Sequence, residues 1–169
     1  MTSGPMSQSR DPARPERMRI RTKQLVAGVL TLVAADVGGW AQFAPQSFYR
    51  SFPGAGHAWI PPLGPYNEHL IRDVGGLYLA LLVISGWAAI RPQPELLRVT
   101  GAAWAAFSVP HLTFHVFHLS LYRTVDQAGN IVTLGGILIL ALLLVLPAPV
   151  DEIGTGTTPS RTTSTEGAQ

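Results

Sequence analysis

The chain has 169 residues, and 13% of them are charged, which is about half the share that is usual in soluble domains. It contains no cysteine, which excludes disulfides, thiolate zinc sites and Cys-ligated iron–sulfur clusters, so any metal would be bound by histidine, carboxylate and carbonyl groups. The pI near 9.4 comes mainly from six basic residues between Arg10 and Lys23, and this local basic segment predicts no nucleic-acid partner.

The first predicted element is a disordered basic tail, residues 1–23, which lacks helical or strand periodicity. An apolar block follows at 24–44, and as a helix it is long enough to cross a hydrocarbon layer of ~30 Å. Its one charged residue is Asp36. The small residues of Gly39-Trp40-Ala41 have the spacing of a signal-peptide cleavage site, but the long basic segment and the interrupting carboxylate favour a retained span.

Residues 45–67 are rich in proline, glycine and aromatic side chains, a composition that disfavours regular elements and suits the headgroup zone of a membrane. We expect Tyr49, Trp59 and Tyr66 to lie in that zone. The second span is predicted at about 70–90, and the two prolines that follow it end the helix.

The third and fourth spans are predicted at about 97–121 and 130–146, and the fourth carries no ionisable side chain. Residues 148–169 consist mostly of threonine, serine and glycine and predict a second disordered tail. The sequence therefore predicts an all-α fold, in which residues 24–147 form a membrane four-helix bundle between two disordered tails.

The basic residues predict how the bundle is oriented. Six of them precede the first span, and Arg91 and Arg98 flank the gap between the second and third spans, against Arg50 and Arg72 at the first gap and Arg123 at the third. The positive-inside rule therefore places both tails in the cytoplasm. A preference for arginine over lysine, with abundant alanine, glycine and proline, is typical of a GC-rich bacterial gene, so we expect a bacterial plasma membrane.

Three histidines recur in the third predicted span. His111, His115 and His118 follow the spacing i, i+4 and i+7, which places them on one face of a helix. The same face continues through Gly101 and Ser108, and small or polar residues are typical of a helix face that meets protein or a water-filled cavity. We predict that this face turns into the bundle.

A second group of polar residues opens the second span. Glu68 stands four residues before Arg72, and His69 stands four residues before Asp73, so two i,i+4 pairs are available. An ionised Asp36 near the middle of the bilayer would cost about 2.5 to 3.5 kcal/mol, so it should face the bundle and find Arg72, a histidine or a proton. These five residues form the predicted polar intramembrane site.

The predicted topology brings the polar groups together in the outer leaflet, where His69, His111, His115 and His118 are candidate metal ligands. Imidazole and carboxylate suit zinc, iron, manganese or copper, and histidine can also ligate haem, relay protons or hydrogen-bond a quinol. The competing interpretation is that these side chains only hold helices together, at about 0.6 kcal/mol for each hydrogen bond.

Two functions therefore stay open. One is a redox or proton-transfer site, with or without enzymatic activity. The other is a non-enzymatic membrane component that binds partner helices, either as a homo-oligomer or with other membrane proteins, since pairs of adjacent glycines suit close helix packing.

The segment YNEHLIRDVGGLYLAL, residues 66–81, together with PHLTFHVFHL in the third span, resembles small, largely uncharacterised four-helix membrane proteins of bacteria and, more distantly, the DoxX-like superfamily. The shared motif is Arg-x-x-Gly-Gly, here Arg72 to Gly76, and the likeness covers roughly 24–147. The resemblance implies a four-span fold. Some DoxX-like proteins are linked to quinone-coupled sulfur oxidation or redox complexes, so it permits a redox role, although the histidine triplet is not a general mark of that superfamily.

Overall fold

The computed structural model describes residues 14–146 of the chain. In chain order its elements are α1 (Arg14–Phe43), α2 (Pro45–Ser51), β1 (Pro53–Gly54), β2 (His57–Ala58), η1 (Pro61–Leu63), α3 (Glu68–Ile90), α4 (Pro94–Phe117), η2 (Leu119–Leu121) and α5 (Thr124–Val145). The predicted tails, 1–23 and 148–169, lie outside the described residues except for 14–23. That stretch is helical, so the tail prediction is wrong there, because Glu, Arg, Met and Lys let a helix that forms in the apolar block extend toward the N-terminus.

Three of the helices are long and apolar enough to cross a membrane, namely Ile20–Phe43, Glu68–Ile90 and Thr124–Val145. This agrees with a membrane protein, and α3 and α5 present large exposed apolar side chains such as Val83 and Val132. Helix α4 is not among these spans, although its 24 residues would suffice in length. Its apolar character is diluted by the polar face that carries Ser108 and the histidines.

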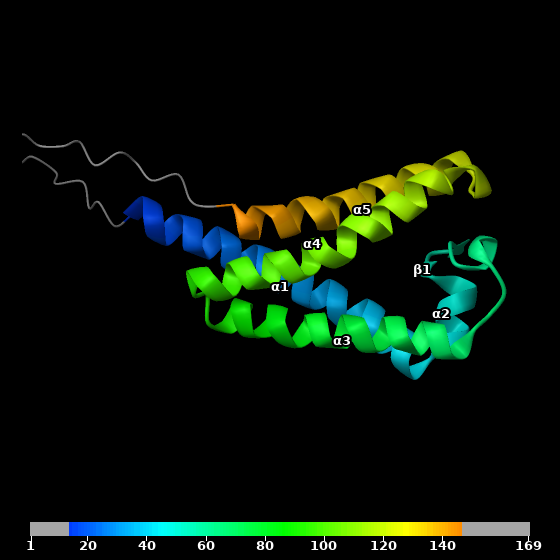
Figure 1. Ribbon diagram of the computed structural model, residues 1–169, viewed down its shortest axis with the longest axis horizontal. Helices are drawn as coiled ribbons and strands as arrows, with labels where there is room; N and C mark the ends of the chain where they lie inside the picture. The colour runs from blue at the N-terminus through cyan, green and yellow to red at the C-terminus, as the bar shows by residue number, and fades with distance from the viewer. Residues whose placement is uncertain (1–13, 147–169) are drawn as a thin grey trace, which may run out of the picture.

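The helices pack as two antiparallel pairs, α1 with α3 and α4 with α5 (Figure 1). Glycines allow the close approach inside each pair. A Cβ at Gly75 would lie 2.6 Å from the backbone nitrogen of Gln42 on α1, and a Cβ at Gly101 would lie 2.6 Å from the carbonyl oxygen of Ala141 on α5. Between α3 and α4, the indole nitrogen of the fully buried Trp104 donates a hydrogen bond of 2.7 Å to the Ser85 hydroxyl. The fold thus has two tight pairs that meet along a less extensive interface.

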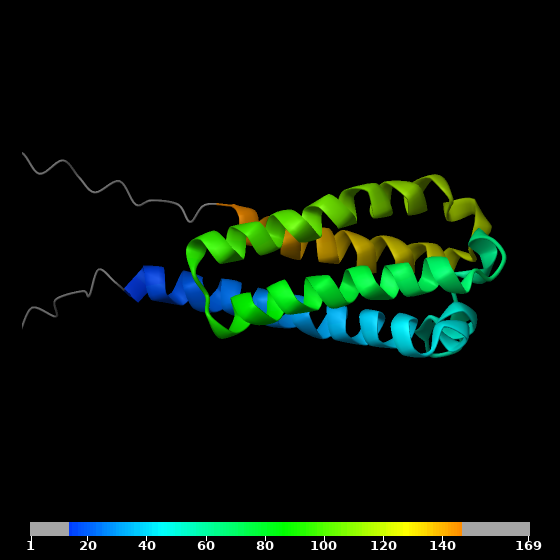
Figure 2. The ribbon, with the colours of Figure 1, turned by 60° about the horizontal axis from the view of Figure 1, so that its bottom comes forward.

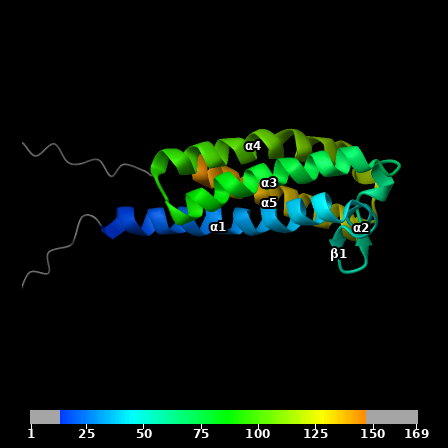
Figure 3. The same ribbon diagram turned by 90° about the horizontal axis from the view of Figure 1, so that it is seen from below.

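A connecting segment, residues 44–67, joins α1 to α3 and crosses one end of the bundle (Figures 2 and 3). It contains α2, a two-stranded hairpin with Pro53 opposite Ala58, and the short helix η1. The hairpin turn needs the positive φ angles of Gly54 and Gly56, at 100° and 84°. The expectation that this segment lacks regular elements is therefore wrong, because glycine and proline here shape tight turns between short elements.

The start of α1 and the end of α5 lie at the same end of the bundle, and the turn between α3 and α4 lies there as well (Figure 1). That turn is set by proline: α3 ends at Ile90, and Pro94 occupies the first turn of α4. At the opposite end, Asn67 caps α3 by accepting a hydrogen bond of 3.1 Å from the backbone nitrogen of Leu70. Helix α5 begins at Thr124, several residues before the predicted span.

Candidate functional site

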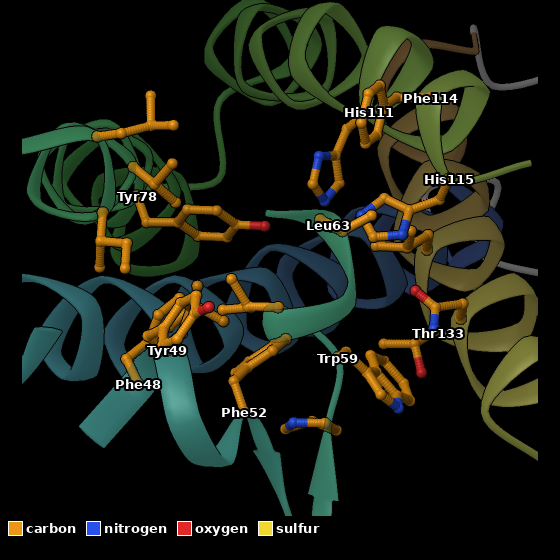
Figure 4. Close-up of a pocket in the computed structure, with 18 of the residues that line it drawn as sticks. Phe48, Tyr49, Phe52, Trp59, Leu63, Tyr78, His111, Phe114, His115 and Thr133 are labelled. Carbon is orange, nitrogen blue, oxygen red and sulfur yellow. The ribbon is translucent and has the colours of Figure 1, made fainter. Parts of the chain in front are cut away.

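A cavity of about 590 Å³ lies between the two helix pairs, near the end that the connecting segment crosses (Figure 4). Its walls come from α1, α3, α4 and α5 and from the connecting segment, and most of the lining is apolar. The aromatic residues that line it are Phe48, Tyr49, Phe52, Trp59, Tyr78 and Phe114. Small-molecule sites commonly have volumes of about 300 to 1,000 Å³, so this cavity is large enough for one ring-bearing molecule.

Helix α4 contributes His111 and His115 to this cavity, as the predicted histidine face requires. The ring of His111 stacks on Phe107 with centroids 4.9 Å apart, and it meets the ring of His115 edge-on at 4.8 Å. Figure 4 shows both imidazoles and the hydroxyl of Tyr78 directed into the cavity from different walls. The cavity therefore presents three groups that can donate or accept a hydrogen bond.

His115 is buried beside Asn130 of α5, which is fully buried and also lines the cavity. The Asn130 amide nitrogen donates a hydrogen bond of 2.9 Å to the carbonyl oxygen of Asp126. The side chains of His115 and Asn130 interact with each other. His115 Nδ1 and Asn130 Oδ1 are both buried from solvent and make no hydrogen bond of good geometry within the described residues, so the pair forms a polar part of the cavity wall.

The four predicted metal-ligating histidines do not come together. The Nδ1 atom of His118 lies 2.7 Å from the carbonyl oxygen of Phe114, and the His118 ring stacks on the Phe114 ring. His69 is exposed at the start of α3 and does not line the cavity. Within residues 14–146, no group of three or more histidine or acidic side chains is placed to hold a metal ion. Only His111 and His115 of the four are neighbours.

The predicted polar residues of the second span pair with each other as expected. An Arg72 guanidinium nitrogen lies 2.9 Å from the Glu68 carboxylate, and His69 Nδ1 lies 3.3 Å from the Asp73 carboxylate. Arg72 also donates a hydrogen bond to the backbone carbonyl of Gln42, which ties α3 to α1. All four side chains are exposed, and they lie outside the cavity lining, so the predicted single polar cluster is divided in two.

Asp36 borders the cavity from α1, but its side chain is exposed. Within the described part of the chain it makes no ion pair and no hydrogen bond. The predicted partner Arg72 is engaged by Glu68 instead. The expected ion pair with Arg72 or a histidine is therefore absent from residues 14–146, and protonation of Asp36 stays a prediction. The residue lies at the edge of the cavity between the helices.

Trp59 is buried and packs on protein, and its place at the depth of the headgroup zone stays a prediction. Its indole nitrogen donates a hydrogen bond of 2.9 Å to Oδ1 of Asp126 at the start of α5, and His57 Nδ1 contacts the same oxygen at 2.5 Å. Gly129 leaves room for the indole, because a Cβ there would lie 2.8 Å from Trp59. These contacts hold the connecting segment on the α4–α5 pair.

Tyr122 makes a third contact that holds the connecting segment at Trp59. Its hydroxyl donates a hydrogen bond of 2.8 Å to the backbone carbonyl of Trp59. Burial, and secondarily the nearby Asp126 carboxylate, raise the pKa of this hydroxyl to about 12. The hydroxyl therefore keeps its proton and remains a donor at physiological pH.

The sequence reasoning missed the connecting segment as a wall of the site. Trp59 and Asp126 are 67 residues apart in the chain, and no local spacing indicates that they meet. The sequence gives only a weak indication that Asn130 belongs to the site, because it is an isolated amide at the start of a strongly apolar run. Tyr78 follows the pattern of apolar residues in α3, and only its position opposite α4 shows that its hydroxyl reaches the cavity.

No protein-family model, curated protein or solved structure matches this chain. The resemblance of Arg72 to Gly76 and its surroundings to DoxX-like proteins therefore stays a prediction from the motif.

Proposed function

We propose that this chain crosses a bacterial plasma membrane four times, with both ends in the cytoplasm, and that its cavity binds a small ring-bearing molecule taken up from the bilayer. Two features support the four crossings. Helix α4 runs beside α5 over a similar length, and the first and last described helices have their outer ends on one side of the bundle (Figure 1). A helix of 24 residues has a length of about 36 Å, which is enough for the hydrocarbon layer.

The observation that carries the binding proposal is the combination of aromatic walls with a few polar side chains in one cavity. Aromatic rings offer flat apolar surface to a ring-bearing ligand. The Tyr78 hydroxyl and the His111 imidazole point into the cavity, where they can form hydrogen bonds with a hydroxyl or carbonyl group of that ligand. The arrangement suits binding and orientation of a molecule, and a proton-transfer role would fall to the histidines that line the cavity.

Three ligand classes followed from the histidine pattern, and the described geometry favours one of them. A metal ion needs three or more protein ligands, and a haem held by two histidines needs them on opposite sides of the ring. His111 and His115 lie one helical turn apart on the same helix and do not provide either arrangement. A quinol needs only a flat apolar slot with a hydrogen-bonding group, so a quinol-like ring fits best.

The binding proposal can be tested by placing a larger side chain in one wall of the cavity. Thr133 lines the cavity from α5, whereas the adjacent Val132 is 73% exposed and does not line it. Equilibrium dialysis of the detergent-purified protein against menadione, a neutral naphthoquinone, should show binding that Thr133→Phe weakens about tenfold or more and Val132→Phe leaves unchanged. Equal affinity in all three proteins, or no binding by a folded wild type, would reject the site.

A second function, the binding of partner helices, is favoured by a separate observation. A Cβ added at Gly39, Gly76 or Gly136 would meet no atom within 4 Å, so these glycines are not needed for packing inside the described chain. Small residues on an open helix face suit close approach of another helix in a membrane. Cross-linking in native membranes should yield a discrete oligomer that Gly76→Leu weakens, and an unaltered monomer band would count against this function.

A further inference from the structure

The cavity contains one formal charge. Of the residues that line it, Asp36 is the only acidic one, and no lysine or arginine is among them. The other lining residues that can become charged near neutral pH are two histidines, and a histidine is mostly neutral at about pH 8. The remaining polar groups are hydroxyls and amides. The interior therefore carries negative charge whenever Asp36 is ionised, and it holds no fixed positive charge to oppose it.

Asp36 also lacks a counter-ion within residues 14–146. Two basic side chains, Lys23 on the same helix and Arg72 on α3, are engaged elsewhere: Arg72 pairs with Glu68, and Lys23 donates hydrogen bonds of 3.1 and 2.7 Å to the carbonyl oxygens of Leu144 and Leu146. A carboxylate in a membrane-spanning helix is unfavourable unless it is protonated or paired. A cation entering the cavity would supply the missing partner.

The aromatic walls would bind the rest of such a molecule. Phe48 and Phe52 lie with ring centroids 4.7 Å apart, and Phe52 meets Trp59 edge-on at 6.2 Å, so the three rings form one continuous wall (Figure 4). Tyr78 lines the cavity from α3. The faces of aromatic rings attract cations, most strongly when water is excluded. Apolar contact and charge thus favour the same kind of occupant.

We infer that the preferred ligand of this cavity is a lipophilic organic cation, whose charge is balanced by Asp36 and whose apolar groups pack on the aromatic wall. This inference rests on the proposed binding function and specifies the charge of its ligand.

Two probes of nearly the same shape and opposite charge test the inference. Tetraphenylphosphonium and tetraphenylborate are measured by equilibrium dialysis against the full-length protein in a nonionic detergent at about pH 8, with menadione as the neutral probe. The phosphonium should bind about tenfold or more tightly than the borate. Asp36→Asn should lower phosphonium affinity by about tenfold and leave menadione affinity unchanged, and Asp36→Glu should retain phosphonium binding.

The matched control is Asp73→Asn, which removes a carboxylate that is exposed on α3 and absent from the cavity lining. It should leave both affinities unchanged. Equal affinity for the two ions, or phosphonium binding that Asp36→Asn does not weaken, overturns the inference. If menadione still binds and Thr133→Phe still weakens that binding, the proposed function stands although the inference about charge fails. If no probe binds the folded protein, the proposed function and the inference both fail. Should Asp36→Asn not fold, the comparison of the two ions on the wild type alone decides.

Discussion

Asp126 shows how one side chain can join distant parts of the chain. A single carboxylate oxygen accepts a hydrogen bond from Trp59 and contacts His57, both in the connecting segment, while its own helix packs against α4. These side-chain contacts join the connecting segment to α5 and so hold the wall of the cavity that the segment forms. The position of Trp59, and with it the shape of the cavity, depends on a few polar contacts.

Tyr122→Phe tests one of these contacts. The substitution removes the hydroxyl that donates to the buried carbonyl of Trp59, so that carbonyl loses its partner. We expect the free energy of unfolding to fall by about 1 to 3 kcal/mol, measured by SDS titration followed by circular dichroism. Tyr66→Phe is the control, because the Tyr66 hydroxyl donates only to the exposed Glu68 at 3.3 Å, and it should have no measurable effect. Equal stability of all three proteins would mean that the carbonyl is readily solvated.

The spacing of residues in the sequence predicted side-chain contacts within one helix and missed contacts between separate segments. The pairs Glu68–Arg72 and His69–Asp73 formed as their i,i+4 spacing indicates. The histidine face of α4 reached the cavity for the same reason, but only as far as His115, because η2 follows the end of α4 and His118 bonds back to its own helix. Sequence spacing also could not reveal that Asp36 borders a cavity while remaining without a protein partner.

At the scale of whole elements, the glycines that lie between helices determine how closely the pairs pack. A Cβ at Gly101 would meet the Ala141 carbonyl oxygen at 2.6 Å and the Cβ of Leu144 at 2.7 Å, and neither atom can move without shifting α5. A Cβ at Gly28 on α1 would meet nothing within 4 Å. Both glycines lie inside helices and have the same local conformation. They differ only in the atoms that surround them.

Gly101→Ala should therefore force α4 and α5 apart and lower the free energy of unfolding by about 1 to 3 kcal/mol. Gly28→Ala should leave it unchanged or raise it by up to about 1 kcal/mol, because alanine favours the helix. SDS titration of the two variants beside the wild type measures both effects. A Gly101→Ala protein as stable as the Gly28→Ala protein would show that the α4–α5 pair adjusts without cost.

The approximate positions of the four long helices were predictable because long apolar runs and prolines leave a strong pattern in the sequence, whereas the short helix α2 was not predicted. The last residue of α3, Ile90, and the first residue of α4, Pro94, follow directly from the prolines in this turn. The start of α1 at Arg14 was not predictable from hydropathy, because helix extension beyond an apolar block depends on helix propensity rather than on burial. The connecting segment was not predictable either, since its short elements are stabilised by contacts with distant helices.

At the scale of the whole molecule, the number of crossings depends on α4. Helices α1, α3 and α5 are each apolar enough to span a membrane, whereas α4 carries its polar residues on the face that meets the cavity and the core. An isolated α4 would be a poor membrane span. Packed between α3 and α5, it places Ser108 and His115 in buried positions and leaves Val109 and Phe117 exposed on the outside of the bundle. We propose that α4 crosses the membrane as part of this bundle.

Because the chain contains no cysteine, single cysteines can report which side of the membrane a residue occupies. Ser51, Glu95 and Ser120 are exposed and lie in the connecting segment, at the start of α4 and after its end. In intact cells, a membrane-impermeant maleimide should label Ser51→Cys and Ser120→Cys, whereas Glu95→Cys should react only after the membrane is opened, because the positive-inside rule predicts that the turn with Arg91 and Arg98 lies in the cytoplasm. Labelling of Glu95→Cys alone would reverse the orientation. Protection of Ser120→Cys beside labelled Ser51→Cys would show that α4 does not cross, and the cavity would then lie at a membrane surface rather than within the bilayer.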